Sequence, residues 1–235
     1  MGYGYFYWDP TYILVLVGAA ICVIASIKMR GTFDRYSKVR SHTGMTGKDA
    51  AEAILRYSGI YDVRVERVSG NLTDHYDPRN KVLRLSDATY GQVSVAAIGV
   101  AAHECGHAVQ HHTGYAPLAI RGSLVPIANI GSTISWPLIL IGLLFNSQIS
   151  VFLINLGIIA FSLAVLFQLV TLPVEINASR RALRILRDSN MLYQTELSAT
   201  KKVLSAAAMT YVAGAASAIL QLLRLLLISN SRSRR

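Results

Sequence analysis

Charged residues are missing from one long stretch of the sequence. Residues 122–174 contain no Asp, Glu, Lys or Arg over 53 positions. A membrane-spanning helix needs about 20 predominantly apolar residues. The stretch therefore predicts two spans, residues 123–145 and 151–172, with a turn at residues 146–150. A buried helix pair in a soluble protein is the alternative, but the length of the run favours a membrane hairpin.

Two further apolar blocks flank the rest of the chain. Residues 10–27 follow an aromatic cluster, and Asp9 precedes them while five basic residues follow within residues 28–40. A signal peptide has its positive charge before the apolar stretch, so this block predicts a retained anchor. Residues 203–223 are rich in Ala, Gly and Ser, which let membrane helices pack closely. They predict a further apolar helix.

The charges indicate how such a chain lies in a membrane. Only 15% of residues are charged, 52% are hydrophobic, and 23 Lys and Arg against 13 Asp and Glu give a net charge of +10. This composition excludes a disordered chain and suits an anionic lipid surface better than nucleic acid. Residues 28–121 hold 13 basic residues and residues 180–202 hold six. Both segments are expected in the cytoplasm, in a multi-pass protein of the plasma membrane.

The sequence does not decide whether the last apolar helix spans the membrane. A full span within residues 203–228 places Arg232, Arg234 and Arg235 outside the cell, against the positive-inside rule. The alternatives are a helix along the inner interface or a re-entrant helix. The expected domains are an anchor at 1–27, a catalytic segment at 28–121, a hairpin at 122–174, a basic helical segment at 175–202 and an apolar helix with a basic tail at 203–235.

The segment 28–121 carries signals of a small α+β unit. Thr46 and Asp49 form a capping-box pattern before a short amphipathic helix. A strand is expected around residues 63–68, and a hairpin from residues 73–76 and 81–86. A buried helix then leads to His103. The expected fold is mainly α, an integral membrane helical bundle with a small cytoplasmic α+β zincin-like catalytic unit.

Catalytic chemistry is expected on the buried helix that contains His103, in the sequence HECGH. His103 and His107 lie at positions i and i+4, so both imidazoles project from one helix face and can grip one ion, which predicts zinc. Glu104 lies about 100° around the helix and can act as general base toward a zinc-activated water. Two surface histidines with an accidental glutamate are the alternative, but the apolar neighbours make an unpaired Glu104 costly.

A catalytic zinc site needs a third protein ligand. The metzincin position is Thr113, which excludes that class, and His111 and His112 do not have its spacing. Glu175 is the stronger candidate, because it ends the uncharged run directly after Pro173. The alternatives are that it offsets a helix dipole or pairs with Arg180.

Three sequence segments carry a family resemblance. HECGH, the stretch NLTDHYDP at residues 71–78 and the stretch LPVEINASRRAL around Glu175 resemble YugP-type membrane zinc metallopeptidases over essentially the whole chain. The resemblance implies a gluzincin-like endopeptidase with one Zn²⁺ on His103, His107 and Glu175, and Glu104 as base. HtpX-type proteases are more distantly similar. Their aspartate four residues after the ligand glutamate is here Ser179, so Ser179 and Asn177 are weaker candidates for orienting a histidine.

The sequence signals for substrate binding and for partners are less specific. A free strand edge at residues 82–85 is one way to bind an extended peptide, and burial within its own sheet is the alternative. His75 and Tyr76 are candidates for stabilising the oxyanion. The expected function is membrane-embedded hydrolysis of peptides or membrane proteins, and the alternative is a zinc-stabilised scaffold or pseudoprotease. Four arginines within residues 180–187 predict contact with anionic lipid, and no nucleic-acid partner is expected.

Overall fold

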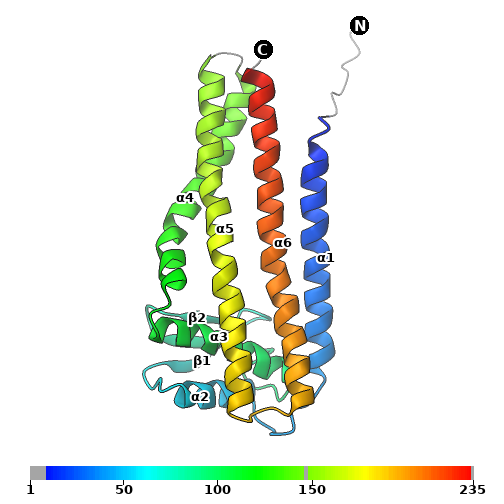
Figure 1. The fold of residues 1–235 in the computed structure, drawn as a ribbon, viewed down its shortest axis with the longest axis vertical. Coiled ribbons are helices and arrows are strands. Elements are labelled where there is room, and N and C mark those ends of the chain that lie inside the picture. Colours follow the sequence, from blue (N-terminus) through cyan, green and yellow to red (C-terminus); the bar gives the residue numbers. More distant parts are fainter. Residues whose placement is uncertain (1–8, 146–147, 234–235) are drawn as a thin grey trace. The chain divides into compact units, whose positions relative to one another are not determined.

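The computed structural model describes residues 9–145 and 148–233 (Figure 1). The long helices are α1 (Tyr12–Ser37), α4 (Ala116–Leu144), α5 (Gln148–Asp188) and α6 (Gln194–Ser233). The short elements are α2 (Gly47–Tyr57), β1 (Arg64–Val68), β2 (His75–Asp77), β3 (Val82–Ser86) and α3 (Val95–His112). The described chain divides into two compact units. One contains residues 9–24, 123–169 and 212–233, and the other contains residues 25–122 and 170–211.

The predicted apolar helices are confirmed. Among the described residues, α1, α4, α5 and α6 are long and apolar enough to cross a membrane, with mean hydropathy between 1.7 and 2.5. All four extend beyond their expected bounds at one end or both, and α5 continues through Pro173 to Asp188. An interior proline removes one backbone hydrogen bond, which apolar helices tolerate when neighbouring groups compensate. The apolar span and the basic segment are thus one helix. Part of the expected turn, residues 146–147, and the aromatic cluster before Asp9 lie outside the described residues.

Glycines bring helices of the first unit together. A Cβ added at Gly131 would lie 2.6 Å from the carbonyl oxygen of Ala160, and one added at Gly157 would lie 3.0 Å from that of Ser135. These approaches join α4 to α5 without room for a side chain, as small residues do between membrane helices. Ile139 and other branched aliphatic residues form the small core beside them.

Helix α6 packs antiparallel to α1 within the same unit. Contacts pair residues of rising number in α1 with residues of falling number in α6. The guanidinium of Arg224 lies 4.1 Å from the ring centre of Tyr12, a Cβ at Gly18 would lie 2.7 Å from Ser217 Oγ, and Cys22 Sγ lies 3.5 Å from the carbonyl oxygen of Ala213. Arg224 also forms an ion pair with Asp9 at 3.6 Å. The part of α6 around Arg224 therefore lies beside the start of α1.

The second unit contains the predicted α+β elements. The capping box of α2 is present, with the Thr46 side chain accepting from the Asp49 backbone N–H and the Asp49 side chain accepting from the Thr46 backbone N–H. The predicted hairpin is also present, with β2 and β3 paired antiparallel. β1 pairs with β3 in parallel, which gives the strand order β1-β3-β2. The expectation of a free edge at residues 82–85 is wrong, because β3 is the central strand.

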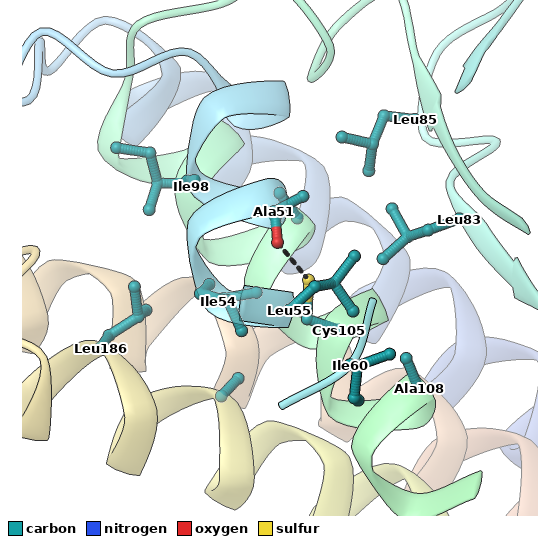
Figure 2. Packing of buried hydrophobic residues seen from close by; sticks show 14 of the residues in the cluster. Ala51, Ile54, Leu55, Ile60, Leu83, Leu85, Ile98, Cys105, Ala108 and Leu186 are labelled. Atoms are coloured by element: carbon teal, nitrogen blue, oxygen red, sulfur yellow. Dashed lines mark hydrogen bonds between the residues drawn. The ribbon is translucent and has the colours of Figure 1, made fainter. Parts of the chain in front are cut away.

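The core of this unit lies between α2, β3 and α3. Cys105 is fully buried there and directs its sulfur toward the carbonyl oxygen of Ala51, at 3.5 Å (Figure 2). Leu83 and Leu85 project from β3 into the same cluster, and Leu186 joins it from α5. Apolar packing thus fixes one face of α3. The polar side chains on the rest of the helix remain available for a functional site.

Candidate metal centre

Helix α3 places two histidines on one face. Its start is capped by Ser94, whose side chain accepts a hydrogen bond from the backbone N–H of Ala97. The His103 and His107 rings lie one turn apart, with ring centres 4.8 Å apart and planes at 84°. Their side chains are 14% and 11% exposed, so both remain within reach of a ligand while most of each ring is sheltered.

Glu175 of α5 meets both histidines. Its Oε2 lies 3.2 Å from His103 Nε2 and 3.5 Å from His107 Nε2, and the three candidate donor atoms lie within 4.8 Å of one another. Two ligands that are about 2.0–2.1 Å from zinc at tetrahedral angles lie about 3.3 Å apart. Both distances to Oε2 match this edge of a tetrahedron. The three residues therefore fit a zinc ion in both chemistry and spacing.

A glycine in the motif allows α3 and α5 to approach so closely. A Cβ added at Gly106 would lie 2.4 Å from the backbone oxygen of Ala178. No side chain fits in that space without moving one of the helices. Gly106 therefore sets the separation at which Glu175 reaches the histidines.

Each histidine has a partner on its second ring nitrogen. Ser179 Oγ lies 3.1 Å from His103 Nδ1, and Gln110 Oε1 lies 3.0 Å from His107 Nδ1. The Gln110 amide nitrogen donates to the carbonyl oxygen of Val174 and to Asn177 Oδ1. Its Oε1 is therefore left as an acceptor, which requires a proton on His107 Nδ1, so Nε2 is the ring nitrogen that faces Glu175 and would bind a metal. Such contacts fix the orientation of ligand histidines.

Glu175 also has two neighbours that the sequence analysis missed. Arg121 of α4 lies 3.2 Å from the other carboxylate oxygen, Oε1, so the arginine that pairs with Glu175 is Arg121 and not Arg180. From α6, the Tyr211 side chain lies near enough for its hydroxyl to feel the charge of Glu175. Arg121 is the last charge before the uncharged run, a signal that could have drawn attention to it. Tyr211 carries no comparable signal in its apolar helix.

Burial and charge shift two pKa values on α3. Burial acts to lower the pKa of His107, but the hydrogen bond to Glu175 and the charge of Glu104 outweigh it and raise the pKa above its ordinary value. Burial raises the pKa of the Cys105 thiol well above its usual range. A protonated, enclosed thiol is a poor nucleophile. Cys105 therefore belongs to the core.

The remaining sequence candidates have partners outside the three-residue cluster. The Tyr76 hydroxyl lies 2.9 Å from His111 Nδ1, and burial raises the Tyr76 pKa to about 12, which keeps that hydroxyl protonated. His75 Nδ1 lies 2.9 Å from the carbonyl oxygen of Thr73. The neighbouring Asp77 accepts two hydrogen bonds from Asn80 in the turn that follows, one from its backbone N–H and one from its side-chain amide. The structure thus gives each of these side chains a local partner.

A pocket of about 190 Å³ opens beside the cluster. His103 and Glu104 form part of its wall, together with side chains from α1, α6 and the loop before β2. Glu104 is 8% exposed and is not one of the three grouped ligand candidates. A carboxylate in a largely enclosed wall beside a metal site is suitably placed to exchange a proton with a bound reactant.

Comparison with known proteins agrees with this geometry. Residues 11–230 match the protein family described as "putative neutral zinc metallopeptidase". The chain belongs to this family of zinc metallopeptidases. It is also 46% identical over 215 residues to "Putative membrane protease YugP" of Bacillus subtilis (strain 168), covering 92% of this chain and 94% of that protein. No solved structure matches this chain. The family implies Zn²⁺, and His103, His107 and Glu175 form the candidate site for it.

Proposed function

We propose that the protein is a membrane-embedded zinc endopeptidase. The convergence of Glu175 with His103 and His107, from two different helices, carries the proposal. Zinc held by these three residues would acidify a water molecule and polarise the peptide carbonyl. Glu104 accepts the proton of the attacking water and delivers a proton to the nitrogen of the leaving amine. Water adds to the carbonyl carbon and the C–N bond breaks, so the products are a carboxylate and an amine.

We also propose that the catalytic unit faces the cytoplasm. The antiparallel packing of α6 on α1 supports a full span for α6, which places both chain ends on one side. The side with the chain ends then has four basic residues, Arg224 and three in the tail, and the opposite side has 19, in residues 28–121 and 180–202. Because basic residues are enriched on the cytoplasmic side, residues 28–121 and 180–202 are assigned to the cytoplasm. Arg180, Arg184 and Lys201 line a groove of about 520 Å³ suited to anionic lipid.

One experiment tests activity and orientation together. We expect casein added outside sealed vesicles to be cut at internal peptide bonds when the cytoplasmic face of the protein is outward. It should stay intact when that face is enclosed. Chelation should stop the cutting, and added zinc should restore it, with about one zinc per chain. Detergent permeabilisation of both preparations is the control. Cutting that survives removal of zinc would contradict the enzyme proposal, and bound zinc without cutting in detergent would favour the scaffold. Cutting only by the opposite vesicles would reverse the orientation.

Tyr211 is better placed than His75 or Tyr76 to stabilise the oxyanion. Its side chain lines the same pocket as His103 and Glu104, and its hydroxyl lies within reach of the Glu175 charge. We expect Tyr211→Phe to lower kcat by about 10²- to 10³-fold, the usual effect of losing one oxyanion donor. Zinc content and KM should change little. Tyr76→Phe is the matched control. Unchanged kcat in Tyr211→Phe, or an equal loss in both variants, would contradict this assignment.

A further inference from the structure

The pocket beside Glu104 has a largely apolar wall. Seven of its lining side chains are apolar, and they come from the end of α1, from α3, from α6 and from the loop before β2: Met29, Phe33, Leu72, Val100, Val203, Leu204 and Ala207. All of them belong to the second compact unit. Because His103 and Glu104 share this wall, a group that enters the pocket lies next to the bond to be cut.

The polar atoms of the wall are already engaged. Both oxygens of Asp74 accept hydrogen bonds from Ser86, one from its backbone N–H and one from its hydroxyl, each at 2.8 Å. The Thr210 hydroxyl donates to the carbonyl oxygen of Ala207 at 2.6 Å. Tyr211 is the residue proposed above to stabilise the oxyanion. Apart from the catalytic groups, the pocket therefore offers a ligand mainly apolar surface.

Leu72 is held in the pocket wall by a fixed loop. Its φ is 56°, in the left-handed region that side-chain-bearing residues seldom adopt. The loop is fastened before Leu72 by hydrogen bonds between Gly70 and Asp87, and after it by the bonds between Asp74 and Ser86. Unfavourable backbone conformations that are held in this way are concentrated at ligand sites. Here the loop contributes one apolar side chain to the wall.

The size of the pocket limits its occupant. A cavity of about 150 Å³ lined by apolar side chains holds a benzene molecule. The 190 Å³ pocket therefore accommodates one phenyl ring or one branched aliphatic chain. We propose that it receives an apolar side chain adjacent to the scissile bond, so that the substrates are peptides cut next to Leu- or Phe-sized residues. This inference rests on the proposed peptidase function.

Peptides that differ at one position test this preference. Each peptide carries Ala, Val, Leu, Phe or Asp within a polar Gly, Ser and Gln host, and the cut is mapped by mass spectrometry. We expect kcat/KM for Leu and Phe to exceed that for Ala by at least about tenfold, since one methylene in an apolar pocket changes it by about 10- to 200-fold. Asp should be the poorest residue.

Variants of the wall should shift the preference in opposite directions. Ala207→Leu fills the pocket and should lower the Phe-to-Ala ratio of kcat/KM at least about tenfold. Leu72→Gly enlarges the pocket and should raise the Phe-to-Leu ratio; glycine suits the left-handed φ, so folding should be retained. Ser205→Leu adds the same side chain to an exposed position on α6 outside the pocket, and it should leave the ratios unchanged.

Binding separates failure of this inference from failure of the proposed function. The Glu104→Gln protein should bind the uncut peptides in the same order, measured by fluorescence anisotropy. Cutting without preference for the apolar residue, or unchanged ratios in both wall variants, would overturn the inference while leaving the peptidase intact. Absence of cutting together with the expected binding order would overturn the peptidase and retain the pocket. Absence of both would overturn both.

Discussion

Replacement of Glu104 by glutamine is expected to lower kcat by about 10²- to 10⁴-fold and to leave zinc binding intact. Glutamine has nearly the same shape as glutamate but cannot accept the proton of the attacking water, and proton transfer by a positioned side chain is worth about that factor. Glu104 lies in the pocket wall and outside the group of three candidate ligands. The measurements are kcat on a mapped peptide, zinc per chain and the thermal unfolding midpoint.

A second carboxylate on an exposed helix provides the control. Glu52 of α2 forms two i,i+4 ion pairs with Lys48 and Arg56 and has 38% of its side chain exposed. Glu52→Gln makes the same chemical change away from the pocket and should leave kcat unaltered. Near-normal turnover in Glu104→Gln would exclude Glu104 as the general base, whereas loss of zinc in that variant would indicate a role in holding the metal.

The second large effect is expected for Glu175→Ala, which should weaken zinc binding more than about 100-fold. Changes to residues that only support a ligand already cost about 10- to 100-fold in metal affinity, and Glu175 supplies a donor atom itself. Zinc competition against a chelator measures the affinity. In the wild type, zinc should raise the unfolding midpoint, because it binds the folded state. In Glu175→Ala this increase should be lost.

Loss of Glu175 has a structural cost that the controls must separate from zinc binding. The variant leaves Arg121 without its 3.2 Å partner in a partly buried position. Glu175→Gln keeps the volume and hydrogen-bonding capacity, and should still bind zinc weakly. Asp188→Ala removes an exposed carboxylate from the same helix and should bind zinc normally. Unaltered affinity in Glu175→Ala would make Glu175 structural and redirect the search to His75, Asp77 or His111.

The sequence predicted the groups that are close along the chain or marked by a change in charge. His103 and His107 share a helix face by spacing alone, and Glu175 stands out because it ends 53 uncharged positions. These are local regularities, which a single sequence can reveal. Ser179, which lies 3.1 Å from His103, was instead suggested by the resemblance to HtpX-type proteases.

Other features depend on contacts between residues that are far apart in the sequence. Gln110 lies one turn after His107, but its role requires Val174, 64 positions away, to accept its amide proton. Arg121 and Tyr211 reach Glu175 from two other helices. The sequence left open whether β3 has a free edge, because its parallel partner, β1, precedes the hairpin and no turn signals their pairing. Such long-range contacts follow from packing.

The ion pair between Arg121 and Glu175 also bears on which metal the protein can select. Because the guanidinium occupies Oε1, the carboxylate presents only Oε2 to the histidines. Calcium requires six to eight oxygen ligands, often with both oxygens of one carboxylate, and magnesium prefers an octahedral oxygen shell. Two imidazole nitrogens and one oxygen suit neither ion. The positive charge of Arg121 also opposes entry of a second cation, so the site discriminates by donor type and admits a single ion.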